Sequence, residues 1–171
     1  MIDDGSRVSW RNIIRYHKAR PRAVVCLWLA CHKRLATEVR LAGLALLQGQ
    51  DKRYCLCKQN DEDIDHLFFQ CPVTLPIWSH ILEWLEFWHR PQKWVEELVW
   101  LIDITRRKGW KISLLKIAIV ETVYSIWSLR NRICFDNIDN TYGIEDSIKD
   151  SIVYIGCQHM KCRSHLVKLM L

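Results

Sequence analysis

The stretch KRYCLCKQNDEDIDHLFFQCP, residues 52–72, interrupts a chain whose apolar residues otherwise recur at helical spacing. It contains four soft metal ligands within 17 residues, Cys55, Cys57, His66 and Cys71, in the arrangement C-x-C-x8-H-x4-C. Zinc prefers a tetrahedron of thiolate sulfur and imidazole nitrogen, and two local pairs across a short loop can close one. The stretch therefore predicts a zinc-knuckle-like loop that holds a structural zinc ion.

The second ligand pair has the more favourable local sequence. We expect His66 on a short helical turn that begins near Asp63, and Cys71 precedes Pro72, which disfavours helical backbone at the cysteine. The competing interpretation is three buried cysteines and a capped histidine, because free cysteine is often buried. The polar, acidic character of the loop favours metal ligation. The C-x-C pair is weaker, since zinc sites more often use C-x-x-C, so a degenerate site is an alternative.

Outside this loop the pattern predicts helices, because apolar residues recur at steps of three and four. We expect Thr37 to cap one of them. Predicted helices cover residues 22–35, 38–47, 72–88, 93–106, 112–135 and 144–169. Expected inward positions are Val24, Trp28, Cys31 and Leu35 in the first, Ile77, Ile81, Leu85 and Trp88 in the third, and Ile148, Ile152, Ile155, His159, Cys162, Leu166 and Leu169 in the last. The fold class expected is mainly α and bundle-like, with at most a small β-hairpin near residues 53–58.

Composition and charge narrow the function classes. The chain has 171 residues, 50% of them apolar, with 6 Gly and 4 Pro, which excludes wholesale disorder. Residues 1–60 contain 12 basic and 4 acidic side chains, and residues 61–104 contain 2 basic and 9 acidic ones. A basic stretch with interspersed aromatic residues is typical of a phosphate-binding surface, although a solvated face gives the same count.

The compartment is also predicted from the sequence. The first ten residues lack the apolar core of a signal peptide, so we expect an intracellular protein of nucleus or cytoplasm that is not secreted. In such a compartment clustered cysteines more often bind metal than form disulfides. The longest uncharged apolar run, residues 23–32, is shorter than the roughly 18 to 20 residues of a membrane span, so no membrane partner is expected.

Several segments together resemble a known family. They are Pro21-Arg22, Leu27–Ala30, Arg34–Thr37, Arg40-Leu41, Cys55–Cys57, Asp65–Pro72 and Ile77-Trp78. In this order and spacing they resemble the zinc-binding region of reverse transcriptases, found near the C-terminus of plant non-LTR (LINE-type) retrotransposon polyproteins. Residues 123–135, VYSIWSLRNRICF, are similar to the trailing IW-x-x-RN-x-x-x-F segment of that family. The resemblance covers residues 10–137 and implies a zinc-binding domain over 1–91 followed by a helical C-terminal extension over 92–171.

The resemblance also assigns the ligands one by one. Cys57, His66 and Cys71 match family ligands. The first family ligand falls at Tyr54, so that Cys55, one position later, is a substitute by proximity.

No catalytic function is expected. The chain has no aromatic-x-Asp-Asp polymerase signature and no endonuclease constellation. The resemblance implies a non-catalytic zinc- and nucleic-acid-binding module whose partner is RNA or DNA. Candidate phosphate contacts are Arg20, Arg22, Lys33, Arg34, Arg40, Lys52, Arg53 and Lys58, and Tyr54 or Trp10 could stack on bases, whereas Trp28 and Trp78 are expected in the core. The alternative is a helical, inactive remnant of a mobile element that has structural or interaction roles only.

Two other groups of potential ligand or catalytic residues are present in the sequence. His80 and Glu83, three residues apart, are expected to form a surface contact on one helix. His159 and His165 lie about 240° apart around a helix, so they cannot converge on one metal with Cys157 and Cys162. Burial in helix packing is the expected role of Cys26, Cys31, Cys134, Cys157 and Cys162.

Overall fold

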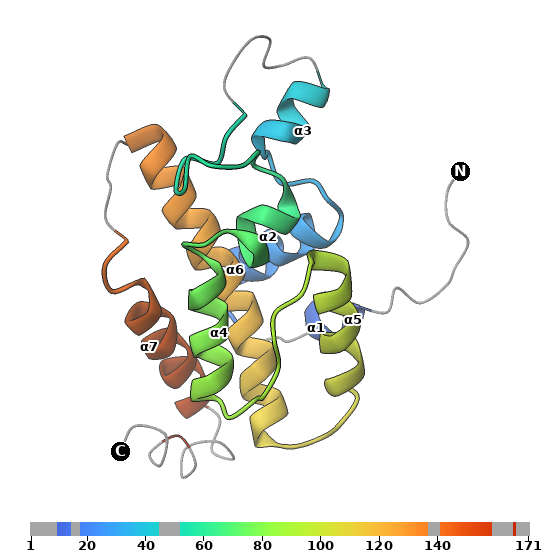
Figure 1. The fold of residues 1–171 in the computed structure, drawn as a ribbon. Helices are drawn as coiled ribbons and strands as arrows, with labels where there is room; N and C mark the ends of the chain where they lie inside the picture. The colour runs from blue at the N-terminus through green and yellow to red at the C-terminus, as the bar shows by residue number, and fades with distance from the viewer. Residues whose placement is uncertain (1–9, 15–17, 45–51, 137–140, 159–165, 167–171) are drawn as a thin grey trace, which may run out of the picture.

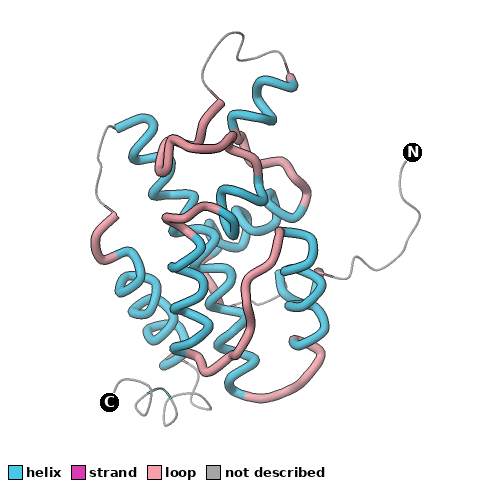
Figure 2. The backbone as a smooth tube through the Cα atoms, viewed as in Figure 1, coloured by secondary structure: helices cyan, strands magenta, loops and turns pink. Residues whose placement is uncertain are grey.

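The computed structural model of the protein describes residues 10–14, 18–44, 52–136, 141–158 and 166. Over these residues it is mainly helical and contains no strand, which confirms the predicted fold class (Figure 2). The helices are α1 (Arg11–Ile14), α2 (Pro21–Cys31), α3 (Glu38–Gly43), the π-helix η1 (His66–Gln70), α4 (Leu75–Trp84), α5 (Trp94–Ile104), α6 (Trp110–Asp136) and α7 (Ile144–Cys157). In place of a hairpin near 53–58, one antiparallel bridge joins Arg53 to Asp61.

The long helix α6 forms the centre of the fold, and α2, α4 and α7 pack against it (Figure 1). Its middle, the run from Ile117 to Val123, is buried on all sides. A helix segment that is buried around its whole circumference must be covered by neighbours. Its length and composition would also suffice to cross a membrane, but 61% of its most apolar 18-residue window is buried inside the structure, which is the pattern of a core helix.

Helix α2 packs on α6 with a different face from the predicted one. Ala23, Leu27 and Ala30 are fully buried, whereas Trp28, expected in the core, is 38% exposed. Residues 23–31 are apolar around the whole helix, so periodicity alone could not select between two stripes. The alanines select the buried face of α2, because their small side chains let α2 approach α6 closely.

The third predicted helix is shorter at both ends than expected. The helix predicted over 72–88 is α4, which begins at Leu75 after a turn and ends at Trp84. Glu86 then adopts a left-handed backbone conformation with φ of 60°, so the chain leaves the helix. Trp88, expected to point inward, is therefore 90% exposed, while Ile77, Ile81 and Leu85 are buried as predicted.

Helix α7 confirms part of the predicted C-terminal stripe. Ile148, Ile152 and Ile155 are buried against the core, as is Leu166. The helix ends at Cys157. The predicted positions His159, Cys162 and Leu169, together with His165, lie outside the described residues.

Side chains from both sides of residue 91 share one hydrophobic core. The buried Glu97 carboxylate accepts hydrogen bonds from the indole Nε1 of Trp78 at 2.7 Å and the backbone N–H of Gln92 at 2.9 Å. The backbone N–H of Trp94 donates to Oδ1 of Asp65 at 2.8 Å. These bonds join α5 to the half of the chain that precedes residue 91, and the domain boundary at residue 91 stays a prediction.

Candidate metal centre

Backbone hydrogen bonds give the loop before η1 a compact shape. The N–H of Tyr54 donates to the carbonyl of Asn60 at 2.8 Å, and the N–H of Lys58 donates to the carbonyl of Tyr54 at 2.7 Å. Lys58 has a φ of 56°, which reverses the chain after Cys57. The reversal leaves the Cys57 thiol on the side of the loop that faces η1.

The π-helix explains the H-x4-C spacing. Asp63 Oδ1 accepts a hydrogen bond from the N–H of His66 at 2.8 Å, which confirms the predicted helical turn. The N–H of Cys71 then donates to the carbonyl of His66 at 2.9 Å, an i to i+5 bond. One turn of the helix therefore separates His66 from Cys71 and places their side chains on the same side.

Cys57, His66 and Cys71 converge. Their ligand atoms all lie within 4.8 Å of one another, and Cys57 Sγ lies 3.1 Å from His66 Nε2. Two thiolates on one tetrahedral zinc are about 3.8 Å apart, given Zn–S bonds of about 2.3 Å. The three donors thus fit the size of a zinc centre, and two sulfurs with one imidazole nitrogen are the donors that zinc prefers.

Burial favours the metal-binding protonation state of His66 and opposes that of Cys71. Burial lowers the pKa of His66, so its imidazole is neutral near pH 7, which is the form that binds metal. Burial raises the pKa of the Cys71 thiol, and N–H groups of Val73 and Thr74 oppose this by favouring the thiolate. The Val73 N–H lies 3.4 Å from Cys71 Sγ. Such outer contacts orient ligands and tune a metal site.

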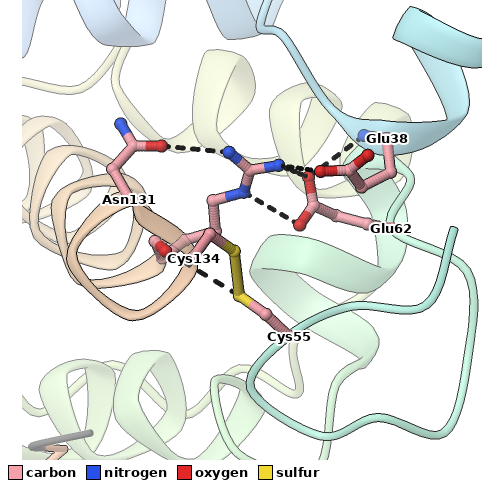
Figure 3. The surroundings of a disulfide bond; sticks show 6 residues. Glu38, Cys55, Glu62, Asn131 and Cys134 are labelled. Carbon is pink, nitrogen blue, oxygen red and sulfur yellow. Dashed lines mark hydrogen bonds and ion pairs between the residues drawn. A yellow bond between two sulfur atoms is a disulfide. The ribbon is translucent and has the colours of Figure 1, made fainter. Parts of the chain in front are cut away.

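Cys55, the fourth predicted ligand, lies apart from the other three. It is joined by a disulfide to Cys134 in α6, with their Cα atoms 6.3 Å apart (Figure 3). Only Leu56 separates Cys55 from Cys57, but the chain forms a turn there, so their side chains point to different neighbours. Cys134, expected as a simple packing residue, is instead the disulfide partner of Cys55.

Tyr54 lies beside the ligands and not at the surface. Its side chain is fully buried, and its ring meets that of His66 edge to face with centroids 5.8 Å apart. Its hydroxyl finds no hydrogen-bond partner among the described residues. The prediction that Tyr54 stacks on bases is incompatible with this burial, because a nucleobase cannot reach the ring.

Sequence reasoning missed the buried ion cluster behind the loop. The guanidinium of Arg130 donates through Nε and Nη2 to the two carboxylate oxygens of Glu62, at 2.9 and 2.8 Å, and through Nη2 to Glu38 at 2.8 Å (Figure 3). Arg130 and Glu62 are both buried. Paired planar groups of this kind make strong, directional contacts. The signal available in the sequence is that Arg130 follows Ile126 by four residues and so continues the buried stripe of Val123 and Ile126, where a charge needs a buried partner.

The trailing segment over residues 123–135 builds the other half of this cluster. Ile126 is buried in the core, and the guanidinium of Arg130 lies 5.1 Å from the ring centroid of Trp127 and 5.6 Å from that of Phe135. Asn131 Oδ1 accepts a hydrogen bond from Arg130 Nη1 at 3.1 Å. This segment thus positions the arginine that pairs with Glu62, next to the loop with the candidate metal ligands.

The predicted phosphate contacts occupy different environments. Arg20 pairs with the buried Glu121, and its guanidinium lies 5.0 Å from the ring centroid of Tyr124. Arg40 is half-buried in α3. The exposed members of the set are Arg22, Lys33, Arg34, Lys52, Arg53 and Lys58. His80, expected to contact Glu83, instead contacts Glu145 of α7, with Nδ1 2.9 Å from Oε1.

The two α2 cysteines should resist alkylation. Burial raises the pKa of Cys26 and of Cys31 to about 12. Only the thiolate reacts, so at pH 8 about one molecule in ten thousand is reactive at either site. Iodoacetamide at pH 8 is expected to label both more slowly than the half-buried Cys157 of α7, as measured by peptide mass spectrometry. Labelling of Cys26 and Cys31 at the rate of a free thiol would contradict this.

Comparisons with known proteins bear on the loop and not on α6. Neither a curated protein nor a solved structure matches the chain. The stretch from residue 1 to residue 78, which contains Cys57, His66 and Cys71, matches the model of the family described as zinc-binding in reverse transcriptase.

Proposed function

We propose that this protein is a non-catalytic module in which residues 52–72 hold a structural zinc ion and the basic surface nearby binds RNA or DNA. The observation that carries the proposal is the convergence of Cys57, His66 and Cys71 within a region that matches a zinc-binding family. An origin in a plant non-LTR retrotransposon is part of the same proposal. It is supported by the resemblance of the segments quoted above.

The metal would stabilise the fold. Cys57, His66 and Cys71 would hold it, and zinc when bound supplies a cross-link between the loop and η1. Cys71 and His66 are buried, and Cys57 is half-buried, so solvent has little access to the centre. Burial of this kind suits a structural site better than one that must admit a substrate.

Nucleic-acid binding is supported by where the charges lie. Lys52, Arg53 and Lys58 are exposed on the loop that carries the metal ligands. Arg22 and Arg34 are exposed on α2 and the segment after it. A folded loop would fix the first group in place, and neutralised phosphates release counterions, which makes such binding sensitive to salt.

Zinc content tests the metal centre. Protein purified with a reducing agent and without added metal is expected to contain about one zinc per chain by elemental analysis, because three soft donors already converge. Cys71→Ser should reduce the content well below half, and Cys157→Ser, a half-buried cysteine of α7, should not change it. Circular dichroism separates metal loss from unfolding. Equal zinc content in wild type and Cys71→Ser would contradict the assignment and favour an inactive remnant.

Gel shifts in rising salt test the nucleic-acid interface. Binding to RNA or DNA should weaken as salt increases, and Lys52→Ala combined with Lys58→Ala should lower the salt slope by about 1.4 to 1.8, which corresponds to two phosphate contacts. No binding, or binding that ignores salt, would contradict the proposal.

A further inference from the structure

A cavity of about 460 Å³ lies between α2 and the C-terminal half of α6. Its base is apolar and comes from the α2 side, where Cys26 and Leu35 are buried and Leu29 is half-buried. Sites for small organic groups usually have roughly 300 to 1,000 Å³. The cavity is therefore large enough for a flat ring system, and it is open to solvent along one side.

The α6 side of this groove is aromatic. Tyr124 and Trp127 are half-buried along it, and Phe135 is 73% exposed at its end. Each of the three rings is contacted by a guanidinium, that of Arg20 for Tyr124 and that of Arg130 for the other two. Both arginines are themselves held by buried carboxylates. The rings are thus fixed in place, which lowers the entropy cost of stacking a ligand on them.

The rim of the groove is basic. Arg22 and Arg132 line it from opposite helices, both are exposed, and neither has an ion-pair partner within the part of the chain that the structure describes. Asp136 is the acidic residue of the lining. Two other cavities, of about 590 and 370 Å³, are lined by acidic residues that include Asp146. Those cavities would repel a polyanion, whereas the α2–α6 groove would attract one.

We propose that this groove binds an unpaired nucleotide of a single-stranded nucleic acid. The base stacks on the aromatic side, and the flanking phosphates contact Arg22 and Arg132. The inference rests on the proposed function for nucleic-acid binding and adds the location and the strand type. Stacking on aromatic rings beside a basic track is the usual mode of single-strand binding.

The shape of the site selects single strands. A base that enters a groove between two helices must leave its own helical stack, and a paired base cannot do so without breaking its pair. The free-energy cost of unstacking a base is much smaller in a single strand, because no base pair is broken. An acidic peptide could bind the same arginines. A flat base fits the aromatic side better, because its face makes full contact with the face of an aromatic ring.

The test measures binding of a fluorescein-labelled single strand of about a dozen nucleotides by fluorescence anisotropy, as RNA and as DNA, and of the corresponding duplexes. Phe135→Ala is expected to weaken single-strand binding at least about fivefold, because stacking on one ring contributes that much. Arg22→Ala combined with Arg132→Ala should weaken it further and lower the salt slope by about 1.4. Circular dichroism and thermal melting check that each variant is folded.

The matched control removes the same charge elsewhere. Arg106 and Arg107 are exposed between α5 and α6, at the opposite end of α6 from the groove (Figure 1). Arg106→Ala combined with Arg107→Ala should leave single-strand affinity within about twofold of wild type, because a solvated charge far from the bound strand contributes little.

The outcomes separate the two proposals. Loss of single-strand binding in the groove variants but not in the control supports the inference. If the groove variants bind single strands as tightly as the wild type, or if the wild type binds duplexes as tightly as single strands, the inference about the groove is wrong. The proposal of nucleic-acid binding is then unaffected. A wild-type protein that binds neither form contradicts both proposals.

Discussion

Replacing Arg130 with methionine is expected to lower the free energy of unfolding by about 3–5 kcal/mol. The substitution keeps most of the side-chain volume but leaves the carboxylate of Glu62, which is fully buried, without its cation. Glu38 loses the same partner and then faces Glu62 as a like charge. Urea unfolding followed by circular dichroism, with zinc and a reducing agent present, measures the change.

Two variants distinguish the buried charge from other causes. Arg132→Met removes an exposed arginine two residues further along α6, and we expect a change within about 0.5 kcal/mol. Adding Glu62→Leu to Arg130→Met removes the stranded carboxylate and should recover most of the lost stability. If Arg130→Met unfolds at the same urea concentration as Arg132→Met, the cluster does not hold the loop.

Replacing Tyr54 with cysteine is expected to raise zinc affinity at least about tenfold. Position 54 is where the resemblance places the first family ligand, and Tyr54 is buried with its ring against that of His66. A further thiolate would complete four protein ligands, and even outer contacts change metal affinity about 10–100-fold. Competition with a chromophoric zinc chelator measures the affinity.

Tyr54→Phe is the matched control for that substitution. It keeps the ring and removes a buried hydroxyl that has no hydrogen-bond partner among the described residues. Zinc affinity should not change, and the free energy of unfolding should rise by about 1 kcal/mol, because an unpaired buried hydroxyl is unfavourable. A tenfold loss of zinc affinity in Tyr54→Phe would show that the phenol oxygen itself binds the metal.

Much of the fold could be predicted because it depends on local pattern. The Thr37 cap, for example, is confirmed by a hydrogen bond from the Arg40 N–H to its Oγ1 at 3.4 Å. The helical class and the buried stripe of α7 follow from apolar spacing in the same way. The face of α2 could not be predicted, because residues 23–31 are apolar on every side and the choice is made by packing against α6.

In the candidate site, too, the local contacts could be predicted and the contacts between distant residues could not. Cys57, His66 and Cys71 lie within one short segment, so their convergence needs only the turn at Lys58 and the π-helix. The pairing of Cys55 with Cys134 spans 79 residues, and that of Glu62 with Arg130 spans 68. Sequence spacing carries no information about contacts of that range. The spacing therefore predicts Cys55 as a ligand from its place next to position 54 and gives no indication of its partner in α6.

Because Glu62 and Arg130 are far apart in the sequence, the loop that contains Glu62 is synthesised well before the helix that buries it. All three converging ligands are translated by residue 71, and Arg130 follows Glu62 by 68 residues. At about 5–20 residues per second, the arginine is added roughly 3–14 s after the glutamate. The metal centre proposed above can therefore assemble while Glu62 is still hydrated, and α6 buries that carboxylate only afterwards.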